Sequence, residues 1–182
     1  RLAACQWIIQ RGRSAISGDN LRKSLVFMGA HHGAGAAHMK LSNWSYAIRD
    51  LERAIAITEA SFNESYQRLL KTIIYPSLFL ARLQAGDYPG AREALDTLVD
   101  VDIMAKMFAR GQKFNPRYSM YYGDIALAEG DYGEALEAYD IAVRHYEDQV
   151  PSSLKERVAR AKYLQANPKP TPSPSPERRP SP

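Results

Sequence analysis

The chain has 182 residues, with 24 Lys or Arg against 20 Asp or Glu, and a pI of about 9.2. This length suits one compact domain or one short array of small repeats, and the 45% of apolar residues is ordinary for a globular protein. The single cysteine, Cys5, excludes an intrachain disulfide framework and a Cys-based zinc site. No apolar run approaches the roughly 18 residues that would span a bilayer.

The prolines divide the chain into a body and a tail. Seven of the 11 prolines lie in the last 16 residues, which read NPKPTPSPSPERRPSP. Such a segment has no apolar face to bury, and it predicts a disordered Pro-rich tail over 167–182. The tail holds three cations and one acidic residue, so it carries +2 of the net +4 and leaves the body over 1–166 close to neutral.

The chain begins at Arg1 and has no start Met. We therefore expect a processed or trimmed chain, and an exported, periplasmic location is favoured over a cytoplasmic one. The sequence names no compartment beyond that expectation.

Hydrophobic periodicity predicts an all-α body, because apolar residues recur at helical spacing and no hairpin signal interrupts them. In chain order we expect a first helix over 2–16 and then three helix–turn–helix units, at about 24–60, 66–105 and 114–149. A final helix over 152–165 is expected to cap the array, with Ser152 or Ser153 as its N-cap.

The three units share a pattern with a period of 44 residues. Each has an alanine three residues after a turn aromatic, and a large apolar residue four positions later. The alanines are Ala47, Ala91 and Ala135, and the large residues are Leu51, Leu95 and Tyr139. A small residue lets two helices approach closely, and the large residue then fills the space beside it.

Two of the units also contain a Gly-Asp-Tyr turn. Gly86 and Gly130 are expected to end the first helix of their units, because glycine adopts the left-handed conformation without a steric penalty. Asp87 and Asp131 follow as predicted N-caps of the second helices.

These units resemble the tetratricopeptide repeat family, in the bacterial form of the repeat. The resemblance covers about 24–149, and Ala34-Gly35 and Tyr122-Gly123 stand at the Leu-Gly position of the family pattern. Phe79 departs from the family pattern at the matching position, no unit has the closing proline, and the period exceeds the usual 34 or so. The longer period implies longer helices or inserts between units.

The resemblance implies an α-solenoid that acts as a non-enzymatic scaffold for protein–protein interaction, as an accessory or assembly subunit of a larger complex. A partner segment would bind on the concave surface, where the first helices of the units lie. The implied partner-binding residues are His32, Leu80, Arg117, Met120, Tyr121 and Asp124.

Some members of the family hold a partner's C-terminal carboxylate with Lys and Asn on these helices. The matching positions here are His32 and Ala36, Pro76 and Leu80, and Met120 and Asp124. The resemblance therefore predicts no carboxylate clamp, and it predicts a small, apolar groove near the first two repeats. Core packing and partner contact both remain open for an aromatic patch formed by Phe114, Tyr118, Tyr121 and Tyr122, flanked by Arg110, Lys113 and Arg117.

The other motifs point to packing rather than chemistry. His31, His32 and His38 lack the i, i+4 spacing and the carboxylate of a helical zinc site. Cys5 has no base nearby in sequence, and the Gly29–Gly35 region lacks the strand and Gly-Lys-Ser/Thr of a phosphate loop. We expect no catalytic residue, metal, cofactor or small-molecule substrate.

Protein partners within a larger assembly are the expected ligands, with membrane association only through a partner. The basic pI leaves nucleic acid as an alternative. Arg49, Arg53, Arg68, Lys71 and Arg82 do not form a convincing stripe in the sequence, so this alternative is disfavoured.

Overall fold

A computed structural model describes residues 1–15, 20–102, 116–146 and 149–168. These residues form α-helices, and no strand occurs among them. The helices are α1 (Leu2–Ala15), α2 (Asn20–Lys40), α3 (Trp44–Ser61), α4 (Glu64–Ala85), α5 (Tyr88–Val101), α7 (Pro116–Glu129), α8 (Tyr132–Tyr146) and α9 (Ser152–Ala166). The all-α prediction is confirmed. The predicted tail beyond 168, and Arg110, Lys113 and Phe114 of the aromatic patch, lie outside the described residues.

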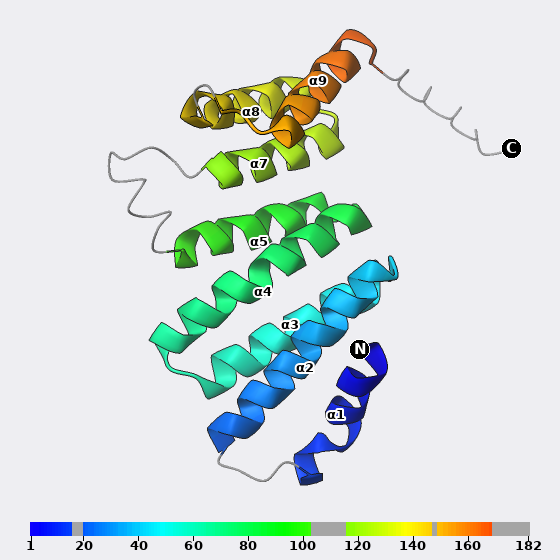
Figure 1. The fold of residues 1–182 in the computed structure, drawn as a ribbon, viewed down its shortest axis with the longest axis vertical. Helices are drawn as coiled ribbons and strands as arrows, with labels where there is room; N and C mark the ends of the chain where they lie inside the picture. The colour runs from blue at the N-terminus through cyan, green and yellow to red at the C-terminus, as the bar shows by residue number, and fades with distance from the viewer. Residues whose placement is uncertain (16–19, 103–115, 147–148, 169–182) are drawn as a thin grey trace, which may run out of the picture.

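Three helical hairpins are stacked along the long axis of the molecule (Figure 1). The hairpins are α2–α3, α4–α5 and α7–α8, and each packs against the next in the stack. At one end α1 packs on α2, and at the other α9 packs on α8 and α7. This arrangement confirms the predicted α-solenoid with a terminal helix.

The turns of the second and third units follow the predicted chemistry. Gly86 and Gly130 have φ angles of 80° and 87°, in the left-handed region. The Asp87 carboxylate accepts a hydrogen bond from the Gly90 amide at 3.0 Å, and Asp131 accepts one from Glu134 at 2.9 Å. Each aspartate thereby caps a helix whose first N–H groups have no partner inside the helix.

The first unit makes the same turn with different residues. Ser42, 44 positions before Gly86, also has a positive φ, of 56°. A side chain with a Cβ is strained in this region, so the left-handed turn is maintained here at a conformational cost. Asn43 stands at the N-cap position of α3 but its side chain makes no capping hydrogen bond.

The seam inside each hairpin is formed by the predicted small and large residues. Ala47, Ala91 and Ala135 are fully buried, as are Leu51, Leu95 and Tyr139. Gly35 and Gly123 allow the closest approach: a Cβ on Gly35 would lie 2.7 Å from Leu51 Cγ, and one on Gly123 would overlap the Tyr139 ring.

The second unit replaces this glycine with Phe79, which is fully buried. Its ring contacts Tyr121 of α7, with 4.8 Å between the ring centroids. Phe79 therefore packs towards the next unit as well as within its own.

The long period has two sources. The first helices α2 and α4 span 21 and 22 residues, whereas α7 spans only 14. Long helices therefore lengthen the first two units, and the chain between α5 and α7 lengthens the interval to the third.

The start of α9 differs from the prediction. Pro151 stands at the N-cap position, and no side chain caps the helix, so the expected role of Ser152 or Ser153 is wrong. The Pro151 carbonyl accepts hydrogen bonds from the amides of Leu154 and Lys155, at 3.0 and 3.1 Å.

The buried side chains form two clusters. The first extends from Met28 of α2 to Ile125 of α7, and the second extends from Ala126 of α7 to Ala161 of α9. Helix α7 thus contributes to both clusters and joins the first two units to the third unit and α9.

Candidate partner-binding face

Four positions recur on each first helix, and we call the side that they occupy the first-helix face. They lie at i, i+4, i+7 and i+11, a spacing that places side chains on one side of a helix, and they recur with the 44-residue period. Their described members are Leu25, Gly29, His32 and Ala36 of α2, then Leu69, Ile73, Pro76 and Leu80 of α4, then Arg117, Met120 and Asp124 of α7.

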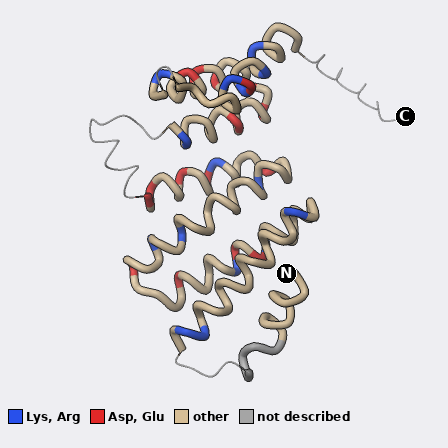
Figure 2. The backbone as a smooth tube through the Cα atoms, viewed as in Figure 1, with Lys and Arg blue, Asp and Glu red and all other residues tan. Residues whose placement is uncertain are grey.

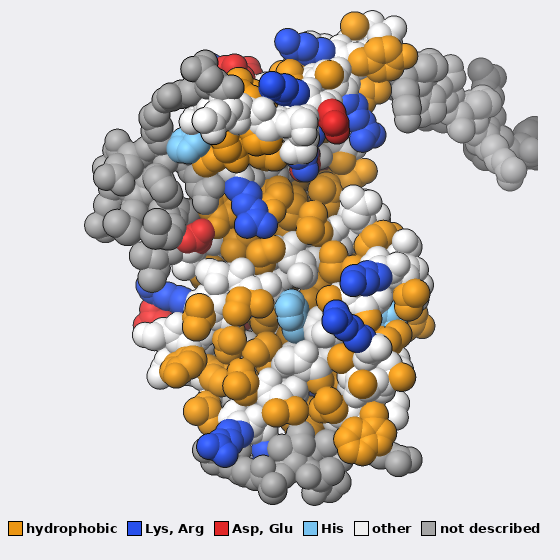
Figure 3. All heavy atoms as spheres, viewed as in Figure 1, with side chains coloured by type: hydrophobic (Ala, Val, Ile, Leu, Met, Phe, Trp, Pro, Cys, Tyr) orange, Lys and Arg blue, Asp and Glu red, His pale blue; other side chains and the backbone are white. Residues whose placement is uncertain are grey.

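The α2 and α4 parts of this face are apolar and exposed. Leu69 is 58% exposed, Ile73 51%, Leu80 37% and Leu25 48%. Figure 3 shows hydrophobic side chains gathered over α2 and α4, with no Asp or Glu at the centre of this area. Single exposed apolar residues are common, but several on one continuous surface are typical of an interaction site.

His32 lies in the same part of the face. Its imidazole is half-buried, its Nε2 has no hydrogen-bond partner, and desolvation lowers its pKa below the ordinary value of 6.5. A neutral imidazole at pH 7 adds no charge to the surrounding apolar surface.

The α7 part of the face is polar and bonded within the chain. Asp124 accepts hydrogen bonds from the Tyr139 hydroxyl and from Arg157 Nε, both at 2.8 Å. Burial raises the pKa of Asp124, while the two donors act in the opposite direction. Asp124 therefore links α7 to α8 and α9 instead of standing free in a groove.

Arg117 and Met120 complete the α7 part, and Tyr121 of the same helix lies against Arg117. Arg117 Nε donates a hydrogen bond to the Tyr121 hydroxyl at 2.8 Å, and its guanidinium lies 5.5 Å from the centre of the same ring. Met120 is partly buried against the second hydrophobic cluster. The six residues implied by the family resemblance are thus divided: His32 and Leu80 lie in the apolar area, and the other four lie on α7.

The remaining tyrosines of the aromatic patch bond to α5 and the residue after it. Tyr118 donates to Asp102, and the Tyr122 hydroxyl donates to Asp96 at 2.5 Å. Burial and the adjacent carboxylates raise the pKa of both phenols. For these two side chains, packing between repeats is the role that the structure supports.

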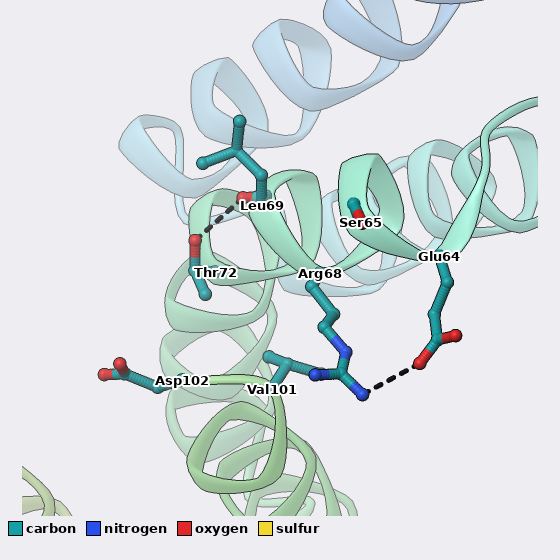
Figure 4. A pocket seen from close by; sticks show the side chains of 7 residues that line it. All are labelled: Glu64, Ser65, Arg68, Leu69, Thr72, Val101 and Asp102. Carbon is teal, nitrogen blue, oxygen red and sulfur yellow. Dashed lines mark hydrogen bonds and ion pairs between the residues drawn. The ribbon is translucent and has the colours of Figure 1, made fainter. Parts of the chain in front are cut away.

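A pocket of about 440 Å³ adjoins Leu69 where α4 meets the end of α5. Figure 4 shows Leu69 on one side of α4 and the Arg68–Glu64 pair on the other. That ion pair is 2.8 Å long, and Thr72 donates to the Leu69 carbonyl at 2.7 Å. Glu64, Arg68 and Thr72 are thus engaged by other groups of α4.

The histidines of α2 contact a residue that the sequence analysis missed. Asp50 of α3 is buried, with its carboxylate oxygens 3.2 Å from His31 Nδ1 and 3.7 Å from His38 Nε2. His31 and His38, seven residues apart on α2, therefore share one carboxylate of α3 as a neighbour. No group of three His, Cys, Asp or Glu suited to a metal occurs in the described part of the chain.

Cys5 and the helix lengths add two further observations. Cys5 is half-buried on α1, and a Cβ on Gly33 would lie 3.0 Å from its Sγ, so the thiol packs against α2. Among the described helices, none has the length and apolar character needed to cross a membrane.

Comparison with known proteins gives one family match, over part of the chain. No curated protein matches the chain. Residues 77–152, which extend from α4 to the start of α9, match the family model of the tetratricopeptide repeat. Such repeats generally mediate protein–protein interaction, and their all-helical fold is typically non-catalytic. The three stacked hairpins and the left-handed glycine turns agree with this match, so residues 77–152 are similar to the tetratricopeptide repeat.

Proposed function

We propose that this protein is a non-enzymatic scaffold that binds an apolar segment of a partner protein on the first-helix face, as an accessory or assembly subunit of a larger complex. The observation that carries the proposal is the exposed apolar area of α4, formed by Leu69, Ile73 and Leu80. Covering these side chains removes apolar surface from water, which is the main favourable term in most protein association.

The chemistry of the area favours an apolar segment over a charged chain terminus. Pro76 and Leu80 occupy positions where a carboxylate clamp would need polar donors. His32, in the α2 part of the face, is kept neutral at pH 7 because desolvation lowers its pKa. An amphipathic helix or an extended segment with several apolar side chains fits such a surface.

Ion pairs on α4 argue against the nucleic-acid alternative. Arg68 pairs with Glu64 at 2.8 Å, Lys71 with Glu59 at 2.7 Å, and Arg82 with Glu52 at 2.9 Å. Phosphate binding depends on cations that can exchange their counterions, and these three already have carboxylate partners.

Site-specific photo-crosslinking tests the proposal. A photoreactive phenylalanine analogue at Ile73 should capture a discrete partner in the cells that produce the protein. The same group at Tyr163, which is exposed on α9, serves as the matched control. Capture at both positions alike, or at neither, would contradict the proposal.

A paired substitution then tests the apolar contact itself. The double variant Leu69→Asp with Ile73→Asp should abolish recovery of that partner. The single variants Leu80→Asp and Met120→Asp should each weaken the recovery. Leu69 and Ile73 are both exposed, so the double variant should keep the circular dichroism spectrum of the unchanged protein. Full recovery of the partner by a folded double variant would refute the role of this face.

A further inference from the structure

A second groove lies on a different side of α2, between α1, α2 and α3. Its volume is about 1010 Å³, and it is partly open to solvent. The lining comprises Ile9 of α1, then Asn20, Lys23, Ser24, Phe27 and His31 of α2, and Arg53, Ala56, Ile57, Ala60 and Ser61 of α3. The α2 residues that line it lie on a different side of that helix from Leu25, Gly29 and His32 of the first-helix face.

Two cations lie on facing walls of this groove. Lys23 is half-buried on α2, and Arg53 is exposed on α3. Within the described residues neither makes an ion pair or a hydrogen bond, and no Asp or Glu lines the groove. Helix α2 contains no acidic residue along its 21 positions, as Figure 2 also shows.

The acidic side chains of α3 are bonded elsewhere. Glu52 pairs with Arg82 at 2.9 Å and Glu59 pairs with Lys71 at 2.7 Å, so both are engaged by α4. Asp50 is occupied by His31 at 3.2 Å. Among the described residues, the charged side chains that line the groove are therefore Lys23 and Arg53, and the nearby carboxylates of α3 are directed to other residues.

The rest of the lining combines apolar and hydrogen-bonding groups. Phe27, Ile57 and Ile9 provide apolar surface, whereas Asn20, Ser24 and Ser61 provide an amide and hydroxyls. A lipid chain requires a continuous apolar enclosure, which this open and mixed lining does not offer. A peptide has backbone groups that need hydrogen-bond partners, and such a lining supplies them.

We propose that the α1–α2–α3 groove binds an acidic, partly apolar peptide segment of a protein, with its carboxylates meeting Lys23 and Arg53. Charge complementarity selects the segment, and apolar side chains against Phe27 and Ile57 add contact area. This binding is separate from the apolar contact of the first-helix face, so the two surfaces can hold different segments at once.

Selection from a random dodecapeptide library displayed on phage, with the full chain as bait, tests the proposal. Enriched peptides should contain Asp or Glu together with apolar residues, and the best binder should weaken severalfold for each acidic residue that is changed to Gln. Binding should also weaken as salt concentration rises. A selection that yields no acidic peptide, or a binder that tolerates the Gln changes, would overturn the proposal.

Matched variants locate the binding. Lys23→Glu with Arg53→Glu should abolish binding of the selected peptide, and the milder Lys23→Gln and Arg53→Gln should each reduce it severalfold with the helical circular dichroism retained. Lys162→Glu, at an exposed position of α9, should leave it unchanged. Equal binding by the double variant would place the peptide elsewhere.

Two further arms separate this groove from other ligands and from the first-helix face. Vesicles of phosphatidylserine and inorganic phosphate should not compete with the peptide, and competition by either would assign the cations to a phosphate group instead. Leu69→Asp with Ile73→Asp should leave peptide binding intact. Failure of the crosslinking experiment above therefore would not affect this result, and the two proposals fail independently.

Discussion

The second and third units, α4–α5 and α7–α8, place different residues at the same positions of the repeat. Inside the hairpin, Phe79 of the second unit stands at the position that Gly123 occupies in the third. On the first-helix face, exposed Leu80 corresponds to Asp124, which is bonded to Tyr139 and Arg157. The repeat therefore determines where a side chain points, and the neighbouring unit determines which chemistry it can carry there.

The largest effect is expected at the seam of the third unit. Gly123→Ala would bring a Cβ into the Tyr139 ring, and such overpacking costs about 1–3 kcal/mol of unfolding free energy. Urea unfolding followed by circular dichroism measures the loss. Adding Tyr139→Leu, which copies Leu95 of the second unit, should recover part of it; a Gly123→Ala chain as stable as the original would contradict the close packing.

A smaller loss is expected when Asp124 is made to resemble its counterpart in the second unit. Asp124→Leu removes the partners of the Tyr139 hydroxyl and of Arg157, at a cost of about 1–2 kcal/mol for the buried phenol. Amide hydrogen exchange should accelerate in α9 before it does in α4. Asp140→Leu, whose carboxylate pairs with Arg144 on the surface of α8, is the control and should leave exchange in α9 unchanged.

Substitutions at the three left-handed turns should each change the free energy of unfolding by about 1 kcal/mol or less. Gly86→Ala and Gly130→Ala introduce a Cβ at φ angles of 80° and 87°, and each should lower stability. Ser42→Gly should raise it, because Ser42 already has a φ of 56°. Thermal unfolding of the three variants checks this pattern, and a stabilising Gly86→Ala would be inconsistent with the turn geometry.

The smallest effect concerns pH and compares His32 with Pro76, its counterpart in the second unit. Desolvation lowers the pKa of His32 in the folded chain, so the unfolded chain binds the proton more readily. Stability should therefore be complete above pH 6.5 and fall as the pH drops below it. His32→Gln should lessen this acid dependence in urea titrations, and an unchanged dependence would attribute it to other groups.

The sequence predicted those features that recur at a regular interval. Two copies of Gly-Asp-Tyr and three alanines were enough to predict the turns and the seam, because turn and packing geometry depend on residues close in the chain. Aligning Ser42 with Gly86 by the same period would also have revealed the third left-handed turn. The family resemblance added the stacking of the hairpins.

Contacts between helices could not be obtained in this way. Asp124 meets Arg157 across 33 residues, and Asp50 meets His31 across 19, so neither pair falls within a local pattern. The apolar face was predicted near the first two repeats, but the exposed residues Leu69 and Ile73 were not identified. Their exposure depends on how the neighbouring hairpins stack, which no single helix encodes.

The division of the core within α7 has a consequence for cooperativity. In repeat proteins, each unit is stabilised by its contacts with the neighbouring units. Segments that share buried contacts unfold together as one cooperative unit. Here the boundary between clusters falls between Ile125 and Ala126, inside a helix. Opening of α8 and α9 would expose the second cluster while the first remains covered, so we expect these two helices to open together, as a unit that differs from the repeat.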